Sequence, residues 1–250
     1  MTSILGVPVD TAYHLVSGFT SFLTPALGGV AAVAAIVLFT VAVRLILMPL
    51  SLRGLRGQAA AARLAPQLQA LRKRYAQQPE RLQREMAALY KREGTSMFAG
   101  LTPLLLQWPL VSVIYLLFRS SQVAGKPNML LTRDLFGVPL GSHWLAGAGP
   151  VSLHGLVFLG VFALLAGLCW LSVRLGRLMT AQQADAPGGA LIRALPYLTV
   201  VIAAFVPLAA GIYLVVSTGW TLAERSFFWR TGRIPGATPN PPAKAVTARR

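Results

Sequence analysis

Acidic residues are scarce in this chain of 250 residues, which has 7 Asp and Glu against 23 Lys and Arg. Charged residues make up 12% of the sequence and hydrophobic residues 55%, whereas a typical soluble domain is about 25% charged and about 45–50% apolar. The apolar residues also form blocks long enough to cross a bilayer, which requires about 20 residues. These proportions exclude an ordinary soluble domain and indicate a membrane protein with several helical spans.

Cysteine and histidine are also rare, with 1 and 3 copies in the chain. A lone Cys169 excludes an intramolecular disulfide and a cysteine-based metal site. We find no nucleophile elbow, zinc-binding His-Glu-x-x-His helix, cysteine pair or phosphate-binding loop, and no pair of carboxylates inside an apolar block. The sequence therefore predicts no catalytic residue, no metal site and no cofactor, and we do not expect an enzyme.

Apolar and polar blocks alternate along the chain and predict an all-α, polytopic membrane protein with five transmembrane helices and a cytosolic helical hairpin. Residues 119–152, rich in Gly and Pro, predict a loop between two of the spans. The expected regions are an extracytoplasmic amino-terminal segment with an interfacial helix over 1–28, a first transmembrane helix over 29–52, the hairpin over 53–97, transmembrane helices two to five within 98–223, and a basic, disordered cytosolic tail over 224–250.

The predicted hairpin differs sharply in composition from the apolar blocks around it. Residues 53–97 hold ten basic and three acidic residues, and leucines recur among them at helical spacing. Gln77 and Gln78 precede Pro79, and proline suits the first turn of a helix because an N–H at that position has no partner within the helix. We therefore predict two helical arms with a break just before Pro79.

The final apolar block, residues 194–223, is long for one helix and short for two, and the charge distribution decides between these alternatives. Basic residues number ten in 53–97, three in 119–152, three in 174–193 and six after 223. Because cytoplasmic loops carry the excess of Lys and Arg, the hairpin and the tail belong on the same side. This requires two crossings in the final block, with a break at Pro207, the amino terminus outside and the carboxyl terminus in the cytoplasm. Basic loops also explain most of the net charge of +16, with contact to anionic lipid or RNA as the alternative.

Arg44 is the most informative polar residue, since it interrupts the first apolar block. It precedes Arg53 by nine residues, which places it about 14 Å into the helix. An arginine at the centre of a membrane helix costs about 2.5–3.5 kcal/mol on insertion scales, and no Asp or Glu lies inside any predicted span. Two interpretations follow: the side chain extends to the cytoplasmic surface, or it faces a hydrated internal cavity that receives an acidic group from another molecule.

Polar side chains on the other predicted spans offer a lining for such a cavity. Singly, each is explained by a hydrogen bond between helices, and together they predict a hydrophilic pocket opposite Arg44. The substrate-binding candidates beside Arg44 are Gln107 and Ser112 in the second span, Thr199 in the fourth, and Tyr213 and Ser217 in the fifth, where Thr218 is a further polar residue.

Four segments, in the same order, resemble the YidC/Oxa/Alb family of membrane protein insertases. Arg44-Leu-Ile-Leu-Met-Pro-Leu looks like the family's first core helix, and the run that starts at Leu64-Ala-Pro looks like its cytosolic hairpin. Pro103-Leu-Leu-Leu-Gln-Trp-Pro is similar to the family's P-L-L-x-Q-x-P helix. Pro207, with Tyr213 six residues later, resembles the stretch that begins the family's last core helix.

The likeness covers residues 30–225 and departs from the family pattern at three places. Ser96-Met97 stand where the family has Asn-Pro, Leu208-Ala209 where it has Ala-Gly, and Leu214 where it has Trp. The resemblance implies a short bacterial form in the cytoplasmic (inner) membrane, without the large periplasmic domain of some members.

The resemblance also implies a function, that of an insertase and chaperone whose hydrophilic intramembrane groove is centred on Arg44, with Gln107 and Tyr213 as neighbours. Its partners would be nascent membrane proteins and the lipid bilayer, together with the ribosome, through the basic tail and hairpin, and the Sec translocon. No cofactor is implied. Two alternatives stay open: a small secondary transporter or channel with Arg44 as an anion site, and a structural assembly factor that inserts nothing.

Overall fold

The computed structural model describes most of the chain, and the described residues are mostly helical, as predicted. They are residues 6–94, 112–118, 120, 122–123, 126–146, 152–179 and 194–231. The chain divides into two compact units, a first unit of residues 1–47 and 107–223 and a second unit of residues 48–106 and 224–250. The long helices α2 and α8 each contribute residues to both units.

Helix α1 (Gly6–Leu27) is the amino-terminal helix of the first unit. Val9, Ala12, Val16 and Thr20 are buried, and their spacing of three or four residues places them on one face of the helix. The Thr20 hydroxyl donates to the Val16 carbonyl at 2.8 Å, so its burial leaves no donor unsatisfied. The predicted amino-terminal helix therefore exists, and the face that it buries is directed to the protein core.

Helix α2 (Ala31–Arg74) is continuous over 44 residues and is reached from α1 through the short 3-10 turn η1 (Gly28–Val30). At about 1.5 Å per residue it is about 66 Å long. The first predicted span and the first arm of the hairpin are thus one helix, because the change of composition at residue 52 does not end it. Pro49 and Pro66 lie inside α2, where each removes one backbone hydrogen bond without terminating the helix.

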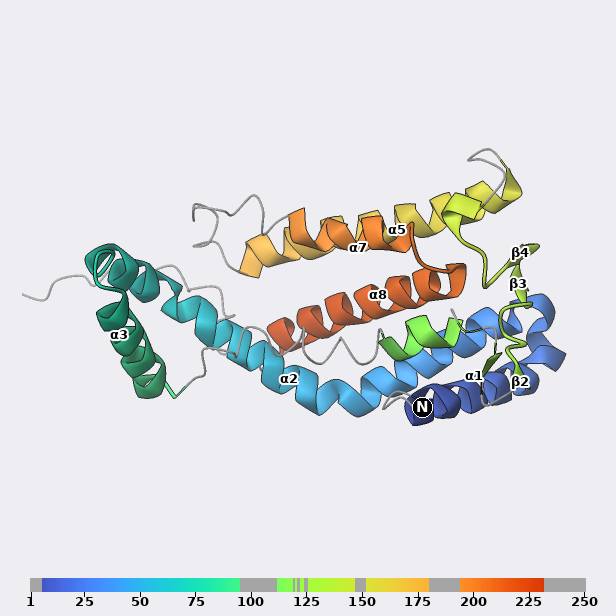
Figure 1. Cartoon of the computed structure of the whole chain (residues 1–250), viewed down its shortest axis with the longest axis horizontal. Coiled ribbons are helices and arrows are strands. Elements are labelled where there is room, and N and C mark those ends of the chain that lie inside the picture. The colour runs from blue at the N-terminus through green and yellow to red at the C-terminus, as the bar shows by residue number, and fades with distance from the viewer. Residues whose placement is uncertain are drawn as a thin grey trace, which may run out of the picture. The chain divides into compact units, whose positions relative to one another are not determined.

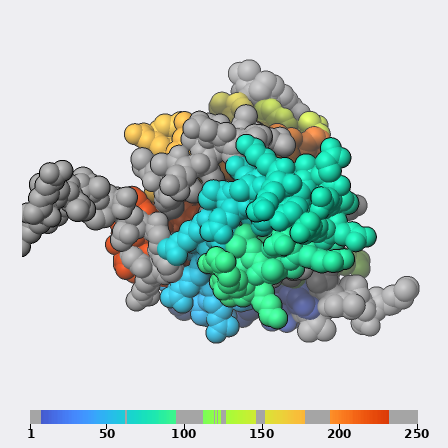
Figure 2. Space-filling view, turned by 90° about the vertical axis from the view of Figure 1, so that its left-hand side faces the viewer, coloured from blue at the N-terminus to red at the C-terminus, as the bar shows by residue number. Residues whose placement is uncertain are grey.

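Helix α3 (Pro79–Arg92) forms the second arm of the hairpin and belongs to the second unit. A turn separates it from α2 and Pro79 lies in its first turn, so the predicted break is confirmed. Leu82, Met86 and Leu89 are half-buried, whereas most of the other residues of α3 are exposed. Figure 2 shows this mostly exposed surface, formed by α3 and the neighbouring turns of α2.

The end of the second predicted span is helical over residues 112–118, and its earlier residues, 98–111, lie outside the described part of the chain. The loop that follows contains two antiparallel pairs of short strands and a 3-10 helix. These elements are β1 (Gln122–Val123) with β2 (Lys126–Pro127), β3 (Asp134–Leu135) with β4 (Val138–Pro139), and η2 (Trp144–Ala146). Phe136 and Gly137 both have positive φ at the tip of the second pair, as a tight two-residue hairpin turn requires.

Helix α5 (Leu153–Met179) corresponds to the third predicted span and is longer than expected, so Arg174 and Arg177 belong to the helix rather than to the loop after it. The final apolar block contains the 3-10 turn η4 (Leu195–Tyr197), α7 (Leu198–Ala203) and α8 (Leu208–Arg230). Pro207 directly precedes α8, so the predicted break in this block is confirmed. Figure 1 shows α7 alongside α5 and the turn that leads from α7 into α8.

Among the described residues, two stretches are long and apolar enough to cross a membrane, Pro8–Ala61 and Leu153–Arg177. The helical run over 194–203 is about 15 Å long, half of a hydrocarbon core of about 30 Å. Helix α8 reaches about 35 Å, but it carries several polar residues. The membrane character of the chain thus has structural support, and the number of five spans stays a prediction.

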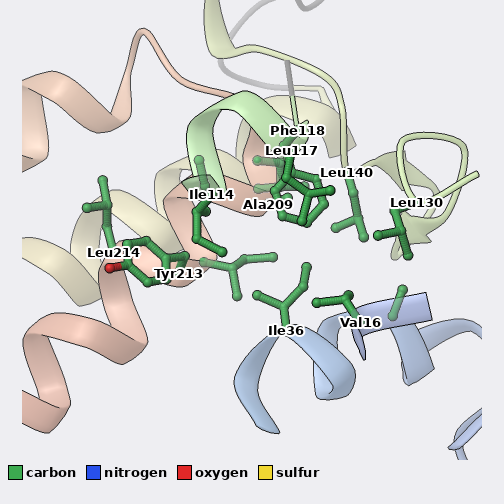
Figure 3. Close-up of a cluster of buried hydrophobic side chains, with 14 of the residues drawn as sticks. Val16, Ile36, Ile114, Leu117, Phe118, Leu130, Leu140, Ala209, Tyr213 and Leu214 are labelled. Carbon is green, nitrogen blue, oxygen red and sulfur yellow. The ribbon is translucent and has the colours of Figure 1, made fainter. Parts of the chain in front are cut away.

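The core of the first unit is one apolar cluster to which α1, α2, residues 112–118, α5 and α8 all contribute (Figure 3). Residues 207–214 at the start of α8 are all buried. Two N–H groups at this helix end donate to carbonyls of the preceding loop, Leu208 to Ser142 at 2.9 Å and Ala209 to Leu140 at 3.0 Å. Because the first N–H groups of a helix have no partner within it, these bonds fix the position from which α8 starts.

Candidate functional site

Arg44 lies on a half-buried face of α2, and its Nη2 atom donates a hydrogen bond to the Ser217 hydroxyl of α8. Ser217 is 1% exposed, whereas Leu45 and Ile46, the next residues of α2, are 53% and 74% exposed. At this point the helix therefore directs Arg44 inward and the apolar side chains of Leu45 and Ile46 outward. Arg44 therefore contacts α8 within the first unit, and the hydrated cavity beside it stays a prediction.

Tyr213 lies one helical turn before Ser217 and is 1% exposed. Its hydroxyl is close to both Ser217 and Arg44, although no hydrogen bond of good geometry to it forms among the described residues. Figure 3 shows its ring in the apolar cluster near Ile114 and Leu214. Tyr213 thus connects the two environments, with an apolar ring in the core and a polar end beside the arginine.

Trp220 continues this polar row along α8. It follows Tyr213 by seven residues and Ser217 by three, a spacing that places all three on one face of the helix. Its indole N–H is buried and has no hydrogen-bond partner in the part of the chain that the structure describes, although a buried indole N–H usually finds one. Trp220 was not among the residues predicted from the sequence, and this helical spacing is the signal that points to it.

The remaining predicted site residues are less informative. Gln107 lies outside the described residues, and Ser112 is half-buried at the start of the helical segment 112–118. Thr199 is half-buried on α7, and its hydroxyl forms no hydrogen bond within the described stretches. Thr218 is also half-buried, on α8. The structure therefore brings together Arg44, Ser217 and Tyr213, and the other predicted lining residues stay predictions.

The second unit has polar contacts of its own between α2 and α8. The Ser51 hydroxyl donates to Oε2 of Glu224 at 2.9 Å, and Nη2 of Arg225 donates to Oε1 of Gln58 at 2.9 Å. Glu224 is 6% exposed and is the one buried charged residue in the described part of the chain. Burial lowers the pKa of the Arg225 guanidinium, because a low-dielectric environment disfavours the charged form.

Glu224 and Arg225 were not predicted as site residues, because the last helix was expected to end at residue 223, where the apolar block ends. Helix α8 in fact continues to Arg230. The first residues of the predicted disordered tail are therefore helical, and two of them are packed against α2. The buried carboxylate of Glu224 is tolerated because it accepts a hydrogen bond from Ser51. That partner is distant in the sequence, so a helix boundary drawn from local composition could not take it into account.

Comparison with known proteins bears on this arrangement of α2 and α8. The family model described as "60Kd inner membrane protein" matches residues 22–233. The chain belongs to this family. The family match extends from the last turns of α1 to the end of α8, and it includes Arg44, Tyr213 and Ser217. It confirms the resemblance stated above, since the matching relatives are members of the YidC/Oxa/Alb group.

Several relatives are described as "Membrane protein insertase YidC". The protein from Clostridium tetani is 34% identical over 114 residues, which cover 46% of this chain and 52% of the relative. The one from Granulibacter bethesdensis is 33% identical over 164 residues, or 64% of this chain and 26% of the relative. The one from Zymomonas mobilis is 28% identical over 195 residues, or 76% of this chain and 33% of the relative. The chain thus spans between about a quarter and about half of the length of these relatives.

Proposed function

We propose that this member of the 60Kd inner membrane protein family is a membrane protein insertase. It accepts client transmembrane segments in a hydrophilic intramembrane groove centred on Arg44 and releases them into lipid. The observation that carries the proposal is the placement of Arg44 against the polar face of α8, beside Ser217 and Tyr213, while its neighbours on α2 present apolar side chains outward.

The physical basis is a lower barrier for polar groups in transit. A client's short acidic outer segment is attracted to the Arg44 guanidinium, and the hydroxyls of Ser217 and Tyr213 and the indole N–H of Trp220 replace part of its lost hydration. The apolar client helix then moves sideways into lipid, driven by transfer of about 25 cal/mol per Å² of apolar surface. The step breaks no covalent bond and requires no nucleotide or cofactor.

The proposed orientation has five spans, the amino terminus outside and the carboxyl terminus in the cytoplasm. The distribution of basic residues supports this orientation, since ten lie in 53–97 and six after 223, and cytoplasmic loops carry the excess of Lys and Arg.

The hairpin and the basic residues of the tail are proposed to lie in the cytoplasm, where they recruit clients. Helix α3 is mostly exposed and carries Arg81, Arg84, Lys91 and Arg92, which suits contact with the phosphate backbone of ribosomal RNA. The proposed partners are nascent membrane proteins and the lipid bilayer, with the ribosome at the hairpin and tail and the Sec translocon as further partners.

The test is a substitution of Arg44 in cells depleted of their own insertase. With Arg44→Ala, insertion of a client with an acidic outer segment should fall about ten- to hundredfold, because a hydrogen bond to a charged group contributes about 1.5–3 kcal/mol. The same client with its acidic residues changed to Asn should insert equally well with either protein. Insertion is measured by protease protection of the outer segment.

Two variants control this experiment. Arg44→Lys keeps the charge and should retain most of the insertion of the acidic client. Arg53→Ala removes an exposed arginine from the same helix and should insert both clients as the unmodified protein does. Equal insertion of the acidic client by the Arg44→Ala variant and the unmodified protein would contradict the proposal, and anion uptake by proteoliposomes that contain only this protein would favour a transporter instead.

A further inference from the structure

A pocket of about 500 Å³ lies at the carboxyl-terminal end of α5. Its lining residues all belong to the first unit and do not include Arg44. It lies between the last turns of α5 and the segment that leads into η4. Its lining residues are Trp170, Val173, Arg174 and Arg177 of α5, with Ala194 and Tyr197 opposite. The pocket therefore combines two guanidinium groups with two aromatic side chains.

The two arginines are arranged on one face of α5 and are available to an anion. Trp170, Arg174 and Arg177 follow one another at intervals of four and three residues, which places them side by side along the helix. The Arg174 guanidinium lies over the Trp170 ring, 5.2 Å from its centroid, a cation–π contact that holds the side chain in place. No carboxylate lines the pocket, and neither arginine forms an ion pair, within the stretches that the structure describes.

The depth of the pocket along α5 indicates the source of that anion. Leu153–Arg177 is apolar enough to cross a membrane, and Arg174 follows Leu153 by about 32 Å at about 1.5 Å per residue, close to the hydrocarbon thickness of about 30 Å. Trp170 lies about one turn nearer the bilayer centre. Trp170 and Leu171 are 54% and 43% exposed, so apolar surface continues from the helix into the pocket.

We propose that this pocket binds the phosphodiester headgroup of an anionic phospholipid, with Arg174 and Arg177 donating hydrogen bonds to the phosphate oxygens. Trp170 and Tyr197 lie at the boundary where aromatic side chains contact the glycerol region of a lipid. An arginine fork matches a phosphate group in geometry and charge, and the adjoining apolar face of α5 supplies a surface for the acyl chains. The inference depends on α5 crossing the bilayer and is independent of whether the protein inserts clients.

The test measures lipid retention by the purified full-length protein in detergent, by native mass spectrometry with phosphatidylglycerol and phosphatidylcholine of identical acyl chains. The unmodified protein should retain phosphatidylglycerol in preference to phosphatidylcholine. In the double variant R174Q/R177Q, phosphatidylglycerol binding should weaken about thirtyfold, since each basic residue beside an anionic membrane surface contributes about fivefold. Both arginines are exposed, and an unchanged helical circular dichroism signal verifies the fold.

The matched control is R81Q/R84Q on α3, which removes the same charge. Arg81 also lies over an aromatic ring, 5.5 Å from the centroid of Tyr75, but it does not line the pocket at the end of α5. This variant should bind phosphatidylglycerol within twofold of the unmodified protein. Equal losses in the two double variants, or no headgroup preference in the unmodified protein, would overturn the proposal in favour of diffuse surface charge.

Two further outcomes would also overturn it. Displacement of phosphatidylglycerol by millimolar inorganic phosphate would mean that the pocket takes a free anion rather than a lipid. Unchanged phosphatidylglycerol binding by R174Q/R177Q, together with lost cosedimentation with ribosomes, would assign the arginines to RNA. Because no client is present in these measurements, their failure leaves the insertase proposal unaffected, and failure of the Arg44 experiment leaves the lipid proposal unaffected.

Discussion

Helices α5 and α8 have similar lengths, 27 and 23 residues, but they place their polar residues in opposite ways. Helix α5 is apolar over most of its length and exposes leucines such as Leu156 and Leu164, 56% and 60% exposed, and its arginines occur only in the last turns. Helix α8 is enclosed over its first two turns and carries Tyr213, Ser217 and Trp220 along one face.

The difference between α5 and α8 follows from what surrounds each helix. A helix that faces lipid has no partner for polar side chains along its length, so they are confined to the level of the headgroups. A helix enclosed by protein can carry them at any level, provided that they face inward to other polar groups. Mean hydropathy thus identifies α5 as a candidate span and does not identify α8 as one, although α8 holds more of the candidate site.

The largest expected effect is on stability, and it compares the buried side of α5 with its exposed side. Leu165 is 0% exposed and its neighbour Leu164 is 60% exposed. Leu165→Ala should destabilise the protein by about 2–5 kcal/mol because it leaves a cavity in the packed core, and lower the melting temperature in detergent by about 5–15 °C. Leu164→Ala should change it by less than about 2 °C, since detergent or lipid fills the space. Equal shifts would show that α5 has no lipid-facing side.

The second prediction concerns the inward polar residues of α8. Glu224→Ala should cost about 1.5–3 kcal/mol, because the variant loses a charge-assisted hydrogen bond from Ser51. Ser51→Ala should cost less, and the double variant should cost less than the sum of the two, as expected for residues in contact. The free energies of unfolding are measured by denaturant titration in detergent.

The control for this prediction is Glu85→Ala on α3, where the carboxylate is exposed. It should change stability by at most about 0.5 kcal/mol. If the Ser51 and Glu224 substitutions change the free energy of unfolding additively, their contact contributes nothing to stability. Helix α8 would then resemble α5 in tolerating the loss of its polar groups.

The smallest expected effect tests how closely α8 approaches α5. A Cβ atom at Gly219 would lie 3.8 Å from the side chain of Leu168, an ordinary contact distance. Gly219→Ala should therefore stabilise the protein by about 0.4–1 kcal/mol, because alanine loses less backbone entropy in a helix. Gly167→Ala on α5 meets no atom within 4 Å and should give the same gain from helix propensity alone. A loss of stability for Gly219→Ala only would show that the two helices are packed more tightly than described.

Much of the local organisation was predictable from short-range signals. The breaks before Pro79 and at Pro207 follow from the missing N–H and fixed φ of proline, and both occur where they were expected. The grouping of Arg44 with Ser217 and Tyr213 was predicted from their polarity within apolar blocks, since a buried polar group requires a partner. Helix boundaries drawn from composition were less accurate, because α2 and α8 both continue past the end of their apolar blocks.

By itself, the sequence determined the helical class, the membrane character and the family of this protein, because apolar block length and a few prolines and polar residues are local properties. Only the tertiary structure decided which polar residues meet. The Arg44–Ser217 contact joins residues 173 positions apart, as does the Ser51–Glu224 contact. Periodicity in the sequence shows which face of a helix is polar, but it does not show which other helix packs against that face. The packing of the helices decides these pairings, and the pairings determine where charge is tolerated inside the protein.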